Sequence, residues 1–218
     1  MNYLAHAFLS GDNREVQLGG LLGDFVKGPI YSPKDQPLNS TANKSTVLQF
    51  DNIRFGIQHH RAIDAYSDSL VSFRNCASLF DKKYRRIAGI IVDICFDHYL
   101  AKQWSQHSKT SLTEFSAALY PKMSDCQLAP ENFKRFSQRC IEARLFEIYQ
   151  DRATIKVALE RVAQRLSRPK LMAGAYEQWE AIYLEMERLF ETCFGEIKSW
   201  AAARLAKHGY HFQQWQPL

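Results

Sequence analysis

The stretch IAGIIVDICF, residues Ile87 to Phe96, is the most apolar run of this 218-residue chain and decides the expected fold. It lies in a region with a helical hydrophobic period at about residues 82–106, and an apolar helix centre is typical of burial in a core. The run contains an aspartate and is far too short to span a bilayer. We therefore predict a buried central helix around which the rest of the chain packs.

Amphipathic patterns on both sides of this run predict further helices. They are expected at about residues 45–80, 111–120, 130–149, 154–166 and 170–207. Pro169 should break the chain before the last of these helices, and Gly195 is expected to bend it. No strand pattern and no internal repeat is present. The prediction is an all-α, single-domain helical bundle over residues 1–218, with a flexible loop at about residues 29–44, where proline, serine and asparagine gather.

The composition limits the class of protein. The chain is 46% hydrophobic and 23% charged, with a formal net charge of +5 and a pI of about 8.9. This mild basicity suits an anionic partner, but basic and acidic residues are mixed, so nucleic-acid binding is not expected. The five cysteines lack Cys-x-x-Cys spacing, which is typical of reduced cysteines in a cytoplasmic protein. No signal peptide or membrane contact is predicted.

Polar residues form a stripe in GIQHHRAIDAYSD, residues Gly56 to Asp68. His60, Asp64 and Asp68 are spaced four residues apart, so on a helix they share one face. Such a stripe can hold a metal ion. It can equally be a solvated salt-bridge face, with Arg61 paired to Asp64.

A second polar group lies inside the apolar run itself. Asp93 and Asp97 are four residues apart, and His98 follows directly. Burying two unpaired carboxylates costs several kcal/mol each, and a bound metal ion would remove that cost. The alternatives are a basic partner for Asp93 and a structural hydrogen-bonded pair of Asp97 with His98.

Two more polar residues stand among apolar neighbours near the start of the chain. Taken alone, His6 would be a hydrogen-bonded core histidine and Asp24 a helix cap. The recurrence of such residues favours a metal site from the set His6, Asp24, His60, Asp64, Asp93, Asp97 and His98. No nucleophile elbow, P-loop or dinucleotide-binding fingerprint is present.

Four motifs occur in order: NYLAHAFLS, GGLLGDFVKG, GIQHHRAIDAYSD and DICFDHYLAKQW. Together they resemble the acyl carrier protein phosphodiesterase family, most strongly from Met1 to Trp104. One departure is Gly19-Gly20, where relatives commonly have Gly-Asn. The resemblance implies a fold similar to the HD phosphohydrolases. It also implies metal-dependent removal of 4′-phosphopantetheine from holo-acyl carrier protein, with Mn²⁺ favoured and Mg²⁺ or Fe²⁺ as alternatives.

With this resemblance, the expected metal ligands are His6, Asp24, His60, Asp64, Asp97 and His98. Asp24 is also expected to act in catalysis, His98 or His59 as the general acid, and Arg61 or Lys27 as a phosphate clamp. Two other functions stay open at this point. One is an HD-like hydrolase of another small phosphodiester or nucleotide, and the other is a helical protein that binds the carrier protein without catalysis.

Overall fold

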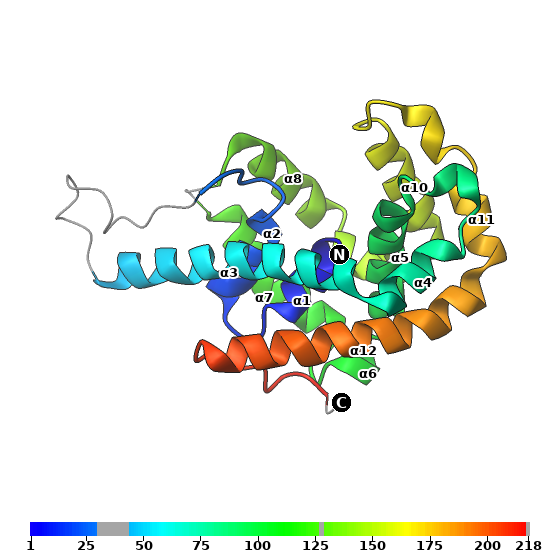
Figure 1. Cartoon of the computed structure of the whole chain (residues 1–218). Coiled ribbons are helices and arrows are strands. Elements are labelled where there is room, and N and C mark those ends of the chain that lie inside the picture. Colours follow the sequence, from blue (N-terminus) through cyan, green and yellow to red (C-terminus); the bar gives the residue numbers. More distant parts are fainter. Residues whose placement is uncertain (30–43, 127–128, 217–218) are drawn as a thin grey trace.

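The computed structural model describes residues 1–29, 44–126 and 129–216, and within them every regular element is a helix (Figure 1). The β-pairing in this part of the chain is a single antiparallel bridge between Ser108 and Trp215. The predicted all-α, single-domain class is confirmed. The loop expected at about residues 29–44 lies almost wholly outside the described residues, and the likeness to HD phosphohydrolases stays a prediction.

From α3 onward, the helices follow one another with short connections. In chain order they are α1 (Tyr3–Leu9), α2 (Arg14–Leu22), α3 (Lys44–Ser69), α4 (Val71–Ser78), η2 (Lys82–Tyr84), α5 (Ala88–Lys102), α6 (Trp104–His107), α7 (Leu112–Ser124), α8 (Glu131–Glu142), α9 (Leu145–Ile148), α10 (Arg152–Ala163), η3 (Pro169–Met172), α11 (Ala175–Ala181) and α12 (Tyr183–Lys207). The two η elements are 3₁₀ helices.

The predicted central helix is α5. Its side chains are buried over most of its length, among them Ile91, Phe96 and Tyr99, none of which is exposed to solvent. Helices α1, α4, α10 and α12 pack around it. The apolar run therefore supplies the surface on which the N-terminal helix α1 rests.

Glycines allow α2 and α3 to pack backbone against backbone. A Cβ at Gly19 would collide with the carbonyl oxygen of Ile53, and one at Gly56 would collide with that of Val16. No larger residue fits at either glycine without moving the helices apart. This close packing brings the end of α2 to the middle of α3, where the stripe of polar residues lies.

Some predicted helix bounds are wrong. The helix expected to reach residue 80 ends at Ser69, because Leu70 adopts an extended conformation and begins α4. The helix expected over residues 170–207 is three elements, with the last break at Ile182. Helix α12 continues through Gly195 without a break, since buried Phe194 and Ile197 hold both sides of that position in the core.

The cysteines and the helix lengths agree with the sequence. All five cysteines are free and buried, so the predicted absence of a disulfide framework is confirmed. Among the described helices, none combines the length and the apolar character that crossing a membrane requires.

Candidate functional site

Two histidines from different helices stack on each other beneath the surface. The rings of His6 on α1 and His60 on α3 have centroids 3.6 Å apart and planes inclined by 21°. Both residues are buried. The Nδ1 atom of His60 donates a hydrogen bond to the Gly20 carbonyl oxygen at 2.7 Å, because a carbonyl can only accept. That bond leaves Nε2 of His60 facing the carboxylates.

Asp64 joins the two histidines into one cluster. Its Oδ1 lies 3.0 Å from Nε2 of His6, and its Oδ2 lies 3.2 Å from Nε2 of His60. One ligand atom from each of the three residues lies within 4.8 Å of the others, and no other such group occurs in the part of the chain that the structure describes. Two imidazole nitrogens and a carboxylate oxygen are donors suited to Mn²⁺, Fe²⁺ or Zn²⁺.

Asp24 borders this cluster from the end of α2. Its Oδ1 lies 3.4 Å from Nε2 of His60, and half of its side chain, 50%, is exposed to solvent. Gly23 makes this approach possible, since a Cβ there would overlap the His60 ring. Of the predicted ligands, the structure thus brings together His6, His60 and Asp64, with Asp24 at the open side.

Arg61 holds the chain that follows Asp24. Its two terminal nitrogens donate hydrogen bonds to the carbonyl oxygens of Val26 and Gly28, at 2.7 and 2.9 Å. The guanidinium group therefore fixes the segment that carries Asp24. These two bonds use two of the five N–H donors of the guanidinium group.

Burial and close neighbours shift the pKa values of the groups in the cluster. Burial lowers the pKa of His6 to about 3, and the neighbouring His60 lowers it as well. Burial also lowers the pKa of His60, but hydrogen bonds to Asp24 and Asp64 outweigh it and raise that pKa to about 9. The pKa of Asp64 is lowered, because both histidines outweigh its burial. Without a metal, the protonated His60 and the Met1 amino group are the cations beside these carboxylates, and a bound metal ion would take the place of the proton on His60.

The hydrogen bonds of His6 provide a test of whether a metal fits. Nδ1 of His6 has no hydrogen-bond partner within the described residues, whereas Nε2 lies 3.0 Å from Oδ1 of Asp64. A buried polar atom without a partner costs about 1–3 kcal/mol. A neutral imidazole is a common metal ligand, and the Nε2 atom of His6 lies among the donors of Asp64 and His60, so these residues fit the predicted ion.

Asp97 lies apart from this cluster and binds the start of α1. Its two carboxylate oxygens accept hydrogen bonds from the backbone N–H groups of Leu4 and Ala5, each at 2.9 Å. Burial raises the pKa of Asp97 to about 7, and the two N–H donors oppose that rise. The carboxylate satisfies donors that a helix N-terminus leaves free, so it anchors the helix that carries His6.

His98 and His59 also have partners elsewhere. The ring nitrogens of His98 lie 2.8 Å from the Tyr149 carbonyl oxygen and 2.8 Å from the Tyr183 hydroxyl. His59 is fully buried, and its Nε2 donates to the Leu9 carbonyl oxygen at 3.0 Å. The structure therefore does not bring either of the two proposed general acids to the cluster.

The amino group of Met1 completes the surroundings of Asp64 and had not been expected from the sequence. It lies 3.2 Å from Oδ1 of Asp64 and 2.7 Å from Oδ1 of Asp93. Asp93 is thus the acid of α5 that faces the cluster. Asp68 is exposed one turn beyond Asp64, and Arg61, which one alternative paired with Asp64, binds backbone carbonyls instead. Motif spacing carries no signal for a backbone amine.

Comparison with known proteins decides the family. The family model described as acyl carrier protein phosphodiesterase matches residues 1–197. The chain belongs to this family. The acyl carrier protein phosphodiesterase of Serratia proteamaculans is 31% identical over 192 residues, which cover 87% of this chain and 92% of the relative. That of Yersinia enterocolitica is 29% identical over 212 residues, covering 92% and 97%. No solved structure matches the chain.

Membership in the acyl carrier protein phosphodiesterase family confirms the resemblance seen in the motifs. It also confirms the predicted class of enzyme, a hydrolase of phosphoric diesters. His6, Asp24, His60 and Asp64 all lie within the matched residues. In this phosphodiesterase, the histidine and aspartate cluster is therefore the candidate active site.

Proposed function

We propose that this enzyme hydrolyses the phosphodiester that joins 4′-phosphopantetheine to a serine of holo-acyl carrier protein. The products are apo-acyl carrier protein and 4′-phosphopantetheine. The names of the relatives support the carrier protein as substrate, and a net charge of +5 suits an acidic protein partner. The observation that carries the proposal is the cluster of His6, His60 and Asp64 with the half-exposed Asp24 beside it.

We also infer that a divalent metal ion is held by His6, His60 and Asp64. The close grouping of donor atoms from these three residues and the neighbouring carboxylate of Asp24 support this. Imidazole donors suit Mn²⁺ or Fe²⁺ better than Mg²⁺, which prefers oxygen ligands, and the family resemblance favours Mn²⁺. When bound, such an ion lowers the pKa of water and neutralises charge on phosphoryl oxygens.

The residues of the chain then have separate tasks. Asp24, at the solvent side of the cluster, is placed to accept a proton from the attacking water. Arg61 keeps the segment of Asp24 in position through two backbone carbonyls. Asp97 anchors the first turn of α1 and so fixes His6 in the same helix. In this proposal, Asp97 and Arg61 act on the reaction through the residues that they position.

Intact-mass measurement of holo-acyl carrier protein after incubation with the enzyme and Mn²⁺ tests the proposal. The expected result is loss of the phosphopantetheine mass. Asp64→Asn should abolish that loss, whereas Asp68→Asn, a matched change of an exposed acid one turn further along α3, should not. Unchanged holo-protein together with hydrolysis of nucleotide phosphodiesters would instead support the other hydrolase function. Binding of the carrier protein without turnover would contradict both.

A further inference from the structure

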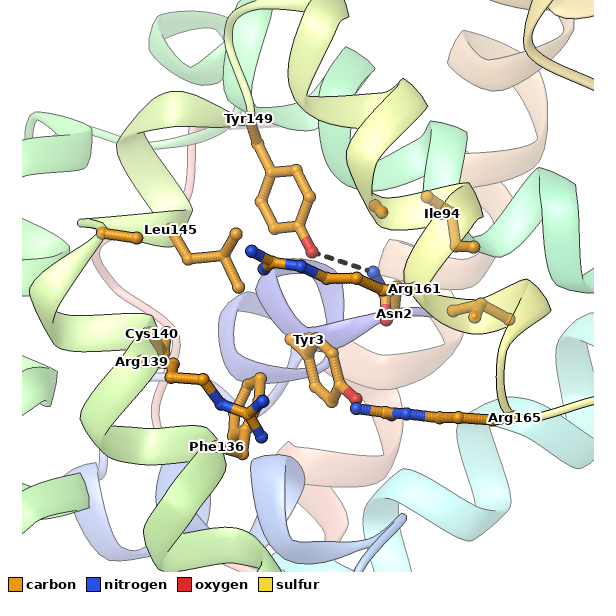
Figure 2. Close-up of a pocket in the computed structure, with 13 residues that line it drawn as sticks. Asn2, Tyr3, Ile94, Phe136, Arg139, Cys140, Leu145, Tyr149, Arg161 and Arg165 are labelled. Atoms are coloured by element: carbon orange, nitrogen blue, oxygen red, sulfur yellow. Dashed lines mark hydrogen bonds between the residues drawn. The ribbon is translucent and has the colours of Figure 1, made fainter.

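A pocket with a mostly apolar lining lies between α1, α5, α8 and α10 (Figure 2). Ile94, Phe136 and Leu145 contribute apolar surface to it. Asn2 and Tyr149 add polar groups, and the Asn2 amide donates a hydrogen bond to the Tyr149 hydroxyl at 3.1 Å. A pocket with apolar walls and a few placed polar groups is the usual form of a small-molecule site.

Three arginines make this pocket strongly positive. Arg139, Arg161 and Arg165 contribute to its lining, and the described lining residues include no carboxylate. Among the described residues, no carboxylate lies within ion-pair distance of any of these guanidinium groups. Guanidinium groups recognise phosphate through paired N–H donors. The pocket is therefore suited to an anionic ligand that also has apolar parts.

Tyr3 connects the pocket to the segment that carries Asp24. Figure 2 shows the ring of Tyr3 inside it, with Arg165 extending to the hydroxyl end of that ring. Tyr3 packs against Phe136, with centroids 4.2 Å apart, and against Phe25, with centroids 6.2 Å apart. Phe25 follows Asp24 directly in the chain. Burial raises the pKa of Tyr3, and Asp24 raises it further, so the phenol lies within the electrostatic reach of that carboxylate.

We propose that this pocket binds the pantetheine arm of the substrate, with its phosphate end next to Tyr3 and Arg165. The inference rests on the proposed function. The arm carries two amides, which match the donors of Asn2, Tyr149 and the arginines, and a dimethyl group, which matches the apolar wall. The phosphate end belongs at Tyr3, because the Tyr3 ring packs against Phe25, which follows Asp24 in the chain. The three arginines supply the positive field that favours a phosphorylated arm over a neutral one.

Calorimetric titration with two probes tests this assignment without requiring turnover. 4′-Phosphopantetheine should bind the enzyme, and pantetheine, which lacks the phosphate, should bind more weakly. The double variant Arg161→Ala/Arg165→Ala should weaken binding of 4′-phosphopantetheine by about tenfold or more, as expected for lost charge-assisted hydrogen bonds. The control is Arg135→Ala/Arg168→Ala, which removes the same charge from exposed positions outside the pocket. It should stay within about twofold of wild type.

Ala158→Phe provides a second variant, because it narrows the pocket without changing its charge. This variant should weaken the binding of both probes, and its thermal unfolding midpoint reports whether the fold is retained. The assignment is overturned if wild type binds neither probe or binds both equally well. It is also overturned if the two double arginine variants bind 4′-phosphopantetheine with the same affinity.

Hydrolysis of holo-acyl carrier protein separates this inference from the proposed function. If wild type is active and the Arg161→Ala/Arg165→Ala variant has an unchanged KM for holo-acyl carrier protein, only the pocket assignment is contradicted. An inactive wild type that still binds 4′-phosphopantetheine through the arginines would contradict only the hydrolysis.

Discussion

Asp97 provides the sharpest difference between the sequence motif and the structure. The motif makes it a metal ligand, whereas the structure gives both of its oxygens to backbone N–H groups of α1, at Leu4 and Ala5. The residue has no exposed surface. Replacing it therefore removes the acceptors of two buried donors, and water cannot reach them from the surface.

The magnitude follows from those two bonds. Each buried N–H group left without a partner costs about 1–3 kcal/mol. Removing a buried charge offsets part of this cost, so Asp97→Ala should lower the free energy of unfolding by about 2–4 kcal/mol. Asp97→Asn keeps one acceptor oxygen and should cost about half as much. For a domain whose total stability is about 5–15 kcal/mol, both losses are large enough to measure.

Urea unfolding followed by circular dichroism measures these changes through the midpoint and slope. Asp68→Ala is the matched control, because its side chain is exposed and its removal should cost little stability. The reasoning is refuted if Asp97→Ala unfolds at the same urea concentration as wild type. It is also refuted if Asp97→Asn retains full stability but loses turnover to the same extent as Asp64→Asn.

Three further changes test the surroundings of the cluster. Gly23→Ala pushes a Cβ into the ring of His60 and should lower kcat/KM by about 100-fold. Gly195→Ala is the control, because a Cβ at that position meets no other atom. It should keep activity and stabilise α12 by about 0.5–1 kcal/mol. Arg61→Ala releases two backbone carbonyls and should lower kcat with little change in KM in steady-state assays. A raised KM with an unchanged kcat would contradict the positioning role of Arg61. Burial lowers the pKa of His59 from 6.5 to about 4, so the unfolded chain binds more protons than the folded one between these values. The free energy of unfolding, measured in urea, should therefore fall as the pH drops from 6.5 towards 4. If the free energy of unfolding of a His59→Gln variant falls as steeply with pH as that of wild type, the prediction is contradicted.

The sequence predicted the helical class and the central helix because these depend on hydrophobic pattern alone. It did not predict α1 and α2 as helices. Gly19 and Gly20 lower helix propensity in α2, and close tertiary contacts explain their presence: Gly19 lies against α3, and Gly20 lies against the end of α1. Tertiary packing, which local pattern does not contain, decides the structure of these segments.

The site was predictable to the extent that helical spacing fixes a shared face. His60 and Asp64 lie next to each other in the cluster, as their spacing of four residues indicated. The same rule paired Asp93 with Asp97, but spacing does not tell which neighbour each side chain meets. In the structure Asp93 approaches Asp64 through the amino group of Met1, while Asp97 turns to α1.

The pocket lined by Arg139, Arg161 and Arg165 could not be predicted from the sequence. Its arginines come from α8 and from the chain at and after α10, where the motif resemblance is weaker. No spacing rule links side chains from separate helices. Their convergence beside Tyr3 depends on the packing of those helices around α5.

The central claim is a metal centre formed by His6, His60 and Asp64 that cleaves holo-acyl carrier protein. Its most direct test is intact-mass analysis of the carrier protein after incubation with enzyme treated with EDTA, before and after Mn²⁺ is restored. The account predicts no cleavage in EDTA, full cleavage when wild type regains Mn²⁺, and none by His60→Gln under the same conditions. Equal cleavage in EDTA, or full recovery of His60→Gln with Mn²⁺, would contradict it.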